Sequence, residues 1–256
     1  KEISMKRLFV VLFSISVFCN LFAQSDTISI SEVIPELYKT QDYQSVIDLC
    51  EQTLANGSES AELYYNLGNA YFKMNELPKA ILNYEKALLL SPNDKDIQYN
   101  LAFAYSHQPD NIEHLSLGFL PRMYQTLYRL FPVDAWAIIG IVFGLLFCVS
   151  VCIFLFSQIL TRKKIALATL LCGLVIGIMA FCCAESRYTE LTAHEYAIVV
   201  EPTTTIKTEP TMQSMDLATI HGGIKVKIIE EAFGWLKVEL GNGKEGWIVA
   251  SNVEKI

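Results

Sequence analysis

Apolar residues follow three different patterns along the chain, and each pattern predicts a different kind of element. Between residues 27 and 108, large apolar and small residues recur in a 34-residue register, which is typical of paired antiparallel helices. Three long apolar runs lie at 8–18, 135–157 and 165–184. From residue 193, short alternating runs punctuated by Gly, Pro and Thr predict strands. We therefore expect a multidomain chain with all-α, membrane and small all-β parts.

The most regular repeat spans residues 61–94. Its signature positions hold Tyr64, Leu67, Gly68, Tyr71, Ala80, Tyr84, Ala87 and Pro92. The large residues fill a seam between two helices, the small ones let backbones approach, and Pro92 ends the second helix. This segment resembles a tetratricopeptide repeat. The same register predicts a degenerate repeat at 27–60, whose first helix Pro35 should break, and a capping helix at 95–108, within a solenoid at 24–110.

The resemblance implies a concave groove that holds a peptide or a partner's helix. By position, the groove residues are Glu62, Tyr65, Asn66, Asn69, Phe72, Lys73, Asp96, Tyr99, Asn100 and Phe103. Asn69 and Asn100 have side chains that both donate and accept hydrogen bonds, so they can hold a peptide backbone without reading its side chains. The alternative is that both asparagines are only solvated helix residues. Acidic groups stand at or beside the positions where a carboxylate clamp needs Lys and Arg, so we do not expect capture of an acidic C-terminus.

The first apolar run has the features of a signal peptide, expected at 1–23. Lys6 and Arg7 precede a short apolar core at 8–18, and the small residue Ala23 precedes the expected cleavage point. We expect translation to start at Met5. An uncleaved anchor is the alternative, and the core is short for a span.

The runs at 135–157 and 165–184 carry no charge and are each long enough to cross a bilayer. The connecting loop at 158–164 contains Arg162, Lys163 and Lys164, which the positive-inside bias places in the cytoplasm. Both flanking parts should then lie outside. The preceding linker at 111–134 includes an amphipathic stretch at 117–131, expected either in the membrane interface or against the end of the repeat domain. Trp136 is a candidate interfacial anchor.

The last part, 193–256, is expected to be a small all-β domain. Four strands are predicted at 196–200, 225–229, 235–240 and 244–249, with a hairpin turn at Gly241-Asn242-Gly243. The order GWLKVEL, GNG, KEGWIVASNV, preceded by the turn His221-Gly222-Gly223, resembles a bacterial SH3 domain. The resemblance implies a ligand face at Trp235 and Trp247, or barrel edges that these two rings only cover. Such domains often bind cell-wall peptides.

Charge and residue chemistry argue against nucleic-acid binding and against catalysis. The net charge is −7, and acidic residues predominate on both sides of the membrane runs, whereas nucleic acid requires clustered Lys and Arg. The four histidines lie apart, and no hydrolase, phosphate-loop or zinc motif is present, so we expect no catalytic residue, metal or cofactor. A remote alternative is membrane thiol redox chemistry. Its cysteines would be Cys148, Cys152, Cys172, Cys182 and Cys183.

The order of signal peptide, tetratricopeptide repeats, membrane hairpin and SH3 domain resembles the BatE-like membrane proteins of Bacteroidetes aerotolerance operons. The resemblance implies an inner-membrane scaffold with both terminal domains in the periplasm. Its implied partners are membrane proteins with von Willebrand A domains and a MoxR-type ATPase, in envelope stress or aerotolerance. The alternative is a peptidoglycan-binding or envelope-sensing module.

Overall fold

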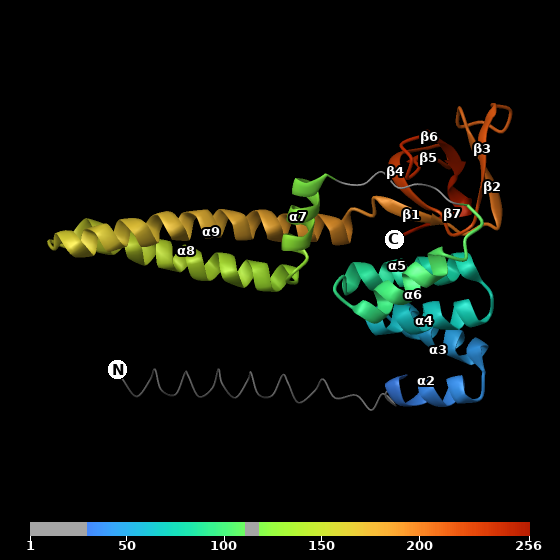
Figure 1. Cartoon of the computed structure of the whole chain (residues 1–256), viewed down its shortest axis with the longest axis horizontal. Helices are drawn as coiled ribbons and strands as arrows, with labels where there is room; N and C mark the ends of the chain where they lie inside the picture. Colours follow the sequence, from blue (N-terminus) through green and yellow to red (C-terminus); the bar gives the residue numbers. More distant parts are fainter. Residues whose placement is uncertain (1–29, 111–117) are drawn as a thin grey trace. The chain divides into compact units, whose positions relative to one another are not determined.

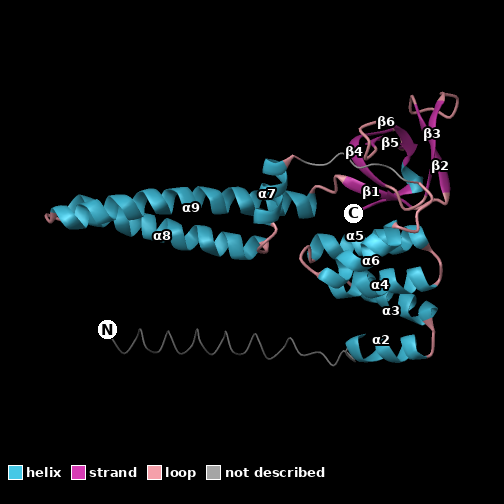
Figure 2. Cartoon of the chain, in the orientation of Figure 1, coloured by secondary structure: helices cyan, strands magenta, loops and turns pink. Residues whose placement is uncertain are grey.

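A computed structural model of the chain describes residues 30–110 and 118–256 (Figure 1). The expected signal peptide and the linker residues 111–117 lie outside the described residues. Within the described residues, a boundary between two compact units falls after Val46. The fold class expected from the sequence is confirmed: Figure 2 shows a helical region, two long apolar helices and an antiparallel sheet.

The first described helices are α2 (Ile30–Lys39) and α3 (Tyr43–Ala55). Pro35 lies inside α2, so the expectation that it breaks this helix is wrong. The helix begins only five residues earlier, and the proline therefore removes one backbone hydrogen bond near the N-terminal end. Before α3, Asp42 accepts hydrogen bonds from the backbone and the hydroxyl of Ser45 at 3.2 and 2.7 Å, which lowers the pKa of its carboxyl group.

The regular repeat consists of α4 (Ala61–Lys73) and α5 (Leu77–Leu90), followed by α6 (Lys95–Tyr105). Ser60 and Asp94 cap the starts of α4 and α6, because their side-chain oxygens accept hydrogen bonds from backbone N–H groups of the first turn. Each helix buries one face. The buried residues are Leu63, Leu67, Gly68 and Ala70 of α4, Ala80 to Glu85 and Ala87 of α5, and Ile97, Leu101 and Ala104 of α6.

The short helix α7 (Phe119–Tyr128) leads into α8 (Val133–Phe156), which pairs along its length with α9 (Leu160–Thr192) (Figure 1). Both long helices are apolar enough to cross a membrane, and most of their apolar side chains are exposed rather than packed in a protein core. Two details differ from the expectation. The basic residues 162–164 lie at the start of α9 instead of in a loop, and α9 continues past Ala184 to Thr192, since no Gly or Pro lies between these two residues.

The C-terminal part is one antiparallel sheet of seven strands in the order β3-β2-β6-β5-β4-β1-β7. The strands are β1 (Tyr196–Val199), β2 (Thr203–Lys207), β3 (Asp216–His221), β4 (Lys225–Ala232), β5 (Trp235–Glu239), β6 (Glu245–Val249) and β7 (Val253–Lys255). Strands β1, β4, β5 and β6 lie where sequence alternation predicts them. β2, β3 and β7 were not predicted. Alternate residues of these strands, among them Val226, Leu236, Val238 and Ile248, form the core.

Candidate functional site

A hydrogen-bonded network crosses from α4 to both α5 and α6. Asn69 Oδ1 accepts from Tyr84 Oη at 2.7 Å and from Asn100 Nδ2 at 2.8 Å. Asn100 Nδ2 also lies 3.0 Å from Tyr65 Oη. The network joins three helices, so the predicted groove residues Tyr65, Asn69 and Asn100 do come together. Their hydrogen bonds also stabilise the packing of the three helices, a role that the sequence did not reveal.

Each asparagine of this network has one polar group that takes no part in it. Among the described residues, Asn69 Nδ2 and Asn100 Oδ1 make no hydrogen bond, and both side chains are only half-buried. One group donates and the other accepts. A pair of this kind matches the C=O and N–H groups of an extended peptide backbone.

Beside the network, α4 and α6 present a cluster of aromatic rings, which we call the aromatic wall: Phe72, Tyr99, Phe103 and His107. Phe103 is its centre, with ring centroids 5.7 Å from Phe72, 6.4 Å from Tyr99 and 4.6 Å from His107. Tyr99 is 70% exposed although it stacks on Phe103. Exposed aromatic rings on a capping helix are unusual, because caps normally turn a polar face to solvent.

The remaining predicted groove residues lie around these two features. Glu62, Lys73 and Asp96 are exposed, and Asn66 is half-buried. The surface is therefore aromatic and amide-lined in the middle and charged at its edge. It suits a peptide or a helix better than a small metabolite.

The opposite side of α5 packs against the sheet. Ile81 of α5 shares a buried cluster with Ile198 of β1 and with Ile256. Lys225 Nζ lies 2.7 Å from Glu85 Oε2, and Lys86 Nζ lies 2.7 Å from Glu254 Oε1. The repeat and the sheet are thus in direct contact, which the sequence pattern does not indicate.

The turn after β3 completes this contact. His221 bonds to the carboxylate of Asp110 through its backbone N–H at 2.7 Å and its ring Nδ1 at 2.9 Å. A Cβ atom on Gly222 would lie 2.6 Å from Pro78 Cγ, and one on Gly223 would lie 2.9 Å from Ile81 Cδ1. Only glycine fits at this distance from α5. The two glycines, expected only as turn residues, also allow the turn to approach α5 closely.

The predicted ligand face of the sheet is only partly open. Trp235 is only 8% exposed, although it does not belong to the buried core cluster of the sheet, so the ligand-face role expected for it stays a prediction. Trp247 is half-buried, and its cross-strand neighbours are Lys207 and Lys237. A burial pattern in which both faces of β5 are covered is typical of a small, strongly bent sheet, and sequence alternation alone does not show it.

Sequence analysis missed Phe233, whose ring is 97% exposed. With Gly234 it forms the two-residue turn between β4 and β5, and both residues have positive φ, +51° and +78°. Asn is the usual residue before Gly in such a turn, and a bulky aromatic residue is strained there. The dipeptide Phe-Gly between two predicted strands was the feature of the sequence that could have indicated this exposed aromatic turn.

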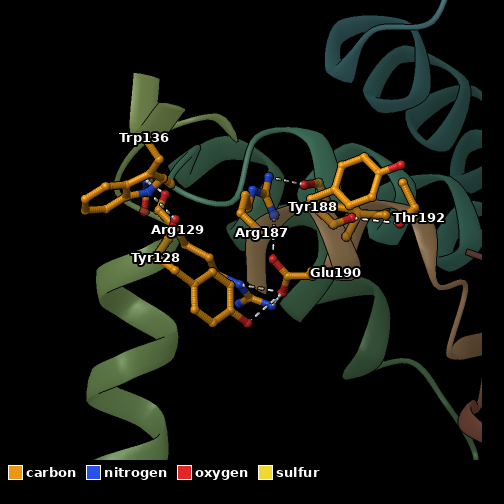
Figure 3. Close-up of polar contacts among 9 residues, drawn as sticks. Tyr128, Arg129, Trp136, Arg187, Tyr188, Glu190 and Thr192 are labelled. Atoms are coloured by element: carbon orange, nitrogen blue, oxygen red, sulfur yellow. Dashed lines mark hydrogen bonds and ion pairs between the residues drawn. The ribbon is translucent and has the colours of Figure 1, made fainter. Parts of the chain in front are cut away.

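Where α9 leaves the apolar region, a charged network connects it to α5 and α7 (Figure 3). The buried Arg187 donates to Leu89 O of α5 at 2.6 Å and to Glu190 Oε2 at 2.5 Å. Glu190 also pairs with Arg129, at the end of α7. A cavity of about 700 Å³ adjoins this network, lined by residues of α5, α7, α9 and β1.

Within the described residues, no group of His, Cys, Asp and Glu could hold a metal ion. The thiols at Cys50, Cys148, Cys152, Cys172, Cys182 and Cys183 are free. Burial, together with the nearby Glu51 charge, raises the pKa of Cys50 to about 11, so its thiol is protonated at neutral pH.

Comparison with known families agrees with this geometry. Residues 61–94 match the tetratricopeptide repeat model, and residues 202–254 match the bacterial SH3 domain model. No curated protein matches the chain. Both matched modules are typically non-catalytic and serve protein interaction, with cell-wall binding as a further property of bacterial SH3 domains. The chain therefore contains two interaction modules and two helices suited to membrane association.

Proposed function

We propose that this protein is a scaffold anchored in the inner membrane, with its repeat and its SH3 domain on the periplasmic side. The observation that carries the proposal is the surface of α4 and α6, where the free polar groups of Asn69 and Asn100 lie beside the aromatic wall. Exposed aromatic rings next to unsatisfied amides favour a protein ligand.

The resemblance to BatE-like proteins supports a more specific version of the proposal. In it, the partners are membrane proteins with von Willebrand A domains and a MoxR-type ATPase, and the assembly serves envelope stress or aerotolerance. The proposed topology is supported by the expected signal peptide at 1–23 and by the basic residues 162–164 at the start of α9.

Co-purification from membranes tests the partner role. The full chain is compared with a Tyr99→Ala, Phe103→Ala variant and with Gln98→Ala as the matched control on the same helix. The double variant should lose a bound partner that the control retains, because it removes exposed rings and leaves the buried face of α6 intact. Equal recovery of partners by all three chains would contradict the proposal.

A reporter fused after Ile256 tests the topology. Activity restricted to the cytoplasm would contradict a periplasmic SH3 domain. The test is independent of any partner, so it separates an error in the orientation from an error in the binding surface.

The exposed Phe233 ring favours a second candidate function, the binding of cell-wall peptides by the SH3 domain. The full chain, in detergent, should then be retained by purified peptidoglycan, and Phe233→Asn should release it. Separate domains are unsuitable for this test, because dividing the chain would expose Ile81, Ile198 and Ile256. Retention that is the same with and without Phe233 would exclude this ring as the contact.

A further inference from the structure

We propose that α7 lies in the plane of the membrane interface, with one face inserted among the lipid headgroups and the other turned toward the soluble domains. The partner of this surface is the lipid bilayer. The inference goes beyond the scaffold function, but it rests on the proposal that α8 and α9 cross a membrane.

The first observation is the division of α7 into two faces. The residues on one side of the helix are apolar: Phe119, Leu120, Met123 and Leu127. Arg122, Gln125, Thr126 and Arg129 form the other side. Phe119 is 79% and Leu120 68% exposed, so within the described residues the apolar side has no cover at its N-terminal end. A short helix with this division is typical of segments that lie on membranes.

The second observation is the level at which α7 meets α9. Tyr124 Oη donates to Cys182 O at 3.1 Å and lies 2.8 Å from Ser186 Oγ. The apolar run of α9 ends at Ala184. The helix α7 is therefore fixed at the height where the expected span meets the headgroups, and Figure 1 shows it crossing the direction of α9 rather than following it.

The third observation is the orientation of the apolar and polar faces of α7 relative to the spans. On the apolar side, Leu127 packs against Trp136, Ala180 and Cys183, all at or within the spans. On the polar side, Arg129 pairs with Glu190, beyond the end of the apolar run. The contacts of α7 thus orient its apolar side toward the hydrocarbon and its polar side away from it.

Trp136 strengthens this arrangement in a way that differs from its expected role. The sequence suggested an interfacial anchor. In the structure the ring is buried, its Nε1 donates to Tyr128 O at 3.0 Å, and it packs edge-on against Phe131. The ring fixes the corner between α7 and α8. Phe119, Leu120 and Met123 are the side chains left to enter the interface.

The test uses the full chain reconstituted in phosphatidylcholine vesicles whose acyl chains carry bromine, which quenches nearby tryptophan. Three variants each add one ring: Leu120→Trp on the apolar face of α7, Arg122→Trp on its polar face, and Leu145→Trp in the middle of α8. The emission of each added ring is obtained by difference from the parent chain, whose three tryptophans remain. Exposed positions are chosen so that none of the changes disturbs packing.

We expect Leu120→Trp to emit at shorter wavelength than Arg122→Trp and to lose intensity to the brominated lipid, as Leu145→Trp does. Long-wavelength, unquenched emission from Leu120→Trp, with Leu145→Trp quenched, would place α7 in water and overturn the inference. Short-wavelength but unquenched emission would show the ring against protein, either this chain or a second copy, and would also overturn it. If the ring of Leu145→Trp is itself unquenched, α8 does not cross the bilayer. The inference about α7 is then overturned as well, because it rests on that span.

Discussion

Lys225 Nζ of β4 donates to Glu85 Oε2 of α5 across 2.7 Å, and this ion pair joins the SH3 domain to the repeat. Glu85 is buried, and its other oxygen accepts a hydrogen bond from Tyr105 Oη at 2.5 Å. Burial and the Glu85 charge raise the pKa of Tyr105 well above its ordinary value, so the phenol remains a donor. The charge of the buried Glu85 carboxylate is therefore stabilised by two partners, Lys225 and Tyr105.

Replacing Lys225 should therefore destabilise the contact. Lys225→Met leaves the Glu85 charge buried with one partner, and we expect a loss of about 1–3 kcal/mol in the free energy of unfolding. The thermal unfolding midpoint of the full chain in detergent measures it. Lys255→Met is the matched control, because its partner Glu231 is exposed, and it should change stability by less than about 0.5 kcal/mol. If Lys225→Met and Lys255→Met changed the unfolding midpoint equally, the ion pair between Lys225 and Glu85 would not stabilise the chain.

Gly222→Ala should also be costly. The added Cβ would meet Pro78 Cγ at 2.6 Å and Glu201 O at 2.8 Å, and neither neighbour is the end of a flexible side chain. We expect a loss of about 1–3 kcal/mol from overpacking, again read from thermal unfolding. In Gly118→Ala the nearest atom would be Pro121 Cδ at 3.8 Å, so this control should leave the midpoint unchanged.

Phe233→Asn should stabilise the chain. Asn tolerates the left-handed backbone at φ +51° far better than Phe, and the exposed ring contributes no packing within the described residues. The expected gain is about 0.5–1 kcal/mol in the free energy of unfolding, measured by denaturant titration. A lower stability for Phe233→Asn would mean that the ring is held by the fold. A gain in stability combined with loss of peptidoglycan binding is the result expected of a residue kept for its ligand.

The sequence predicted the repeat, the apolar helices and four strands well, because each depends on local periodicity. It also brought together Tyr65, Asn69 and Asn100, since the spacing of the repeat fixes which residues share a face. The aromatic wall followed in part from the same spacing, through Phe72, Tyr99 and Phe103. His107 joins it at the end of the capping helix, where the spacing no longer guides prediction.

Contacts between segments far apart in sequence were beyond such reasoning. Nothing in the pattern around Glu85 indicates a partner at Lys225, and nothing around Arg187 indicates a partner at Leu89. The burial of Trp235 could not be predicted, because alternation along β5 indicates one covered face and Trp235 lies on the other. The short strands β2, β3 and β7 have weak alternation, and their pairing depends on the rest of the sheet.

Alkaline pH should weaken the repeat through Tyr84. Burial, chiefly, raises the pKa of the Tyr84 phenol above its ordinary value near 10, so the folded chain keeps this proton where the unfolded chain loses it. The contribution is complete below pH 10 and is lost as the pH rises above it. Tyr84→Phe should therefore show a smaller loss of stability than the parent between about pH 9 and 11 in urea titrations.

The control for Tyr84→Phe is Asn69→Ala. It removes the same hydrogen bond, worth about 1 kcal/mol, but keeps the phenol and should keep the steep alkaline loss. Identical pH dependence for the parent, Tyr84→Phe and Asn69→Ala would show that the Tyr84 proton does not contribute.

If the surface of α4 and α6 holds a protein partner, as we propose, site-specific photo-crosslinking in intact membranes should capture that partner. A photoreactive residue replaces Tyr99 in one chain and Gln98, on the same helix but away from the aromatic wall, in another. We expect one discrete adduct from position 99, absent from position 98 and abolished by Phe103→Ala. Adducts of equal yield at both positions, or none at position 99 in cells that contain the assembled complex, would contradict it.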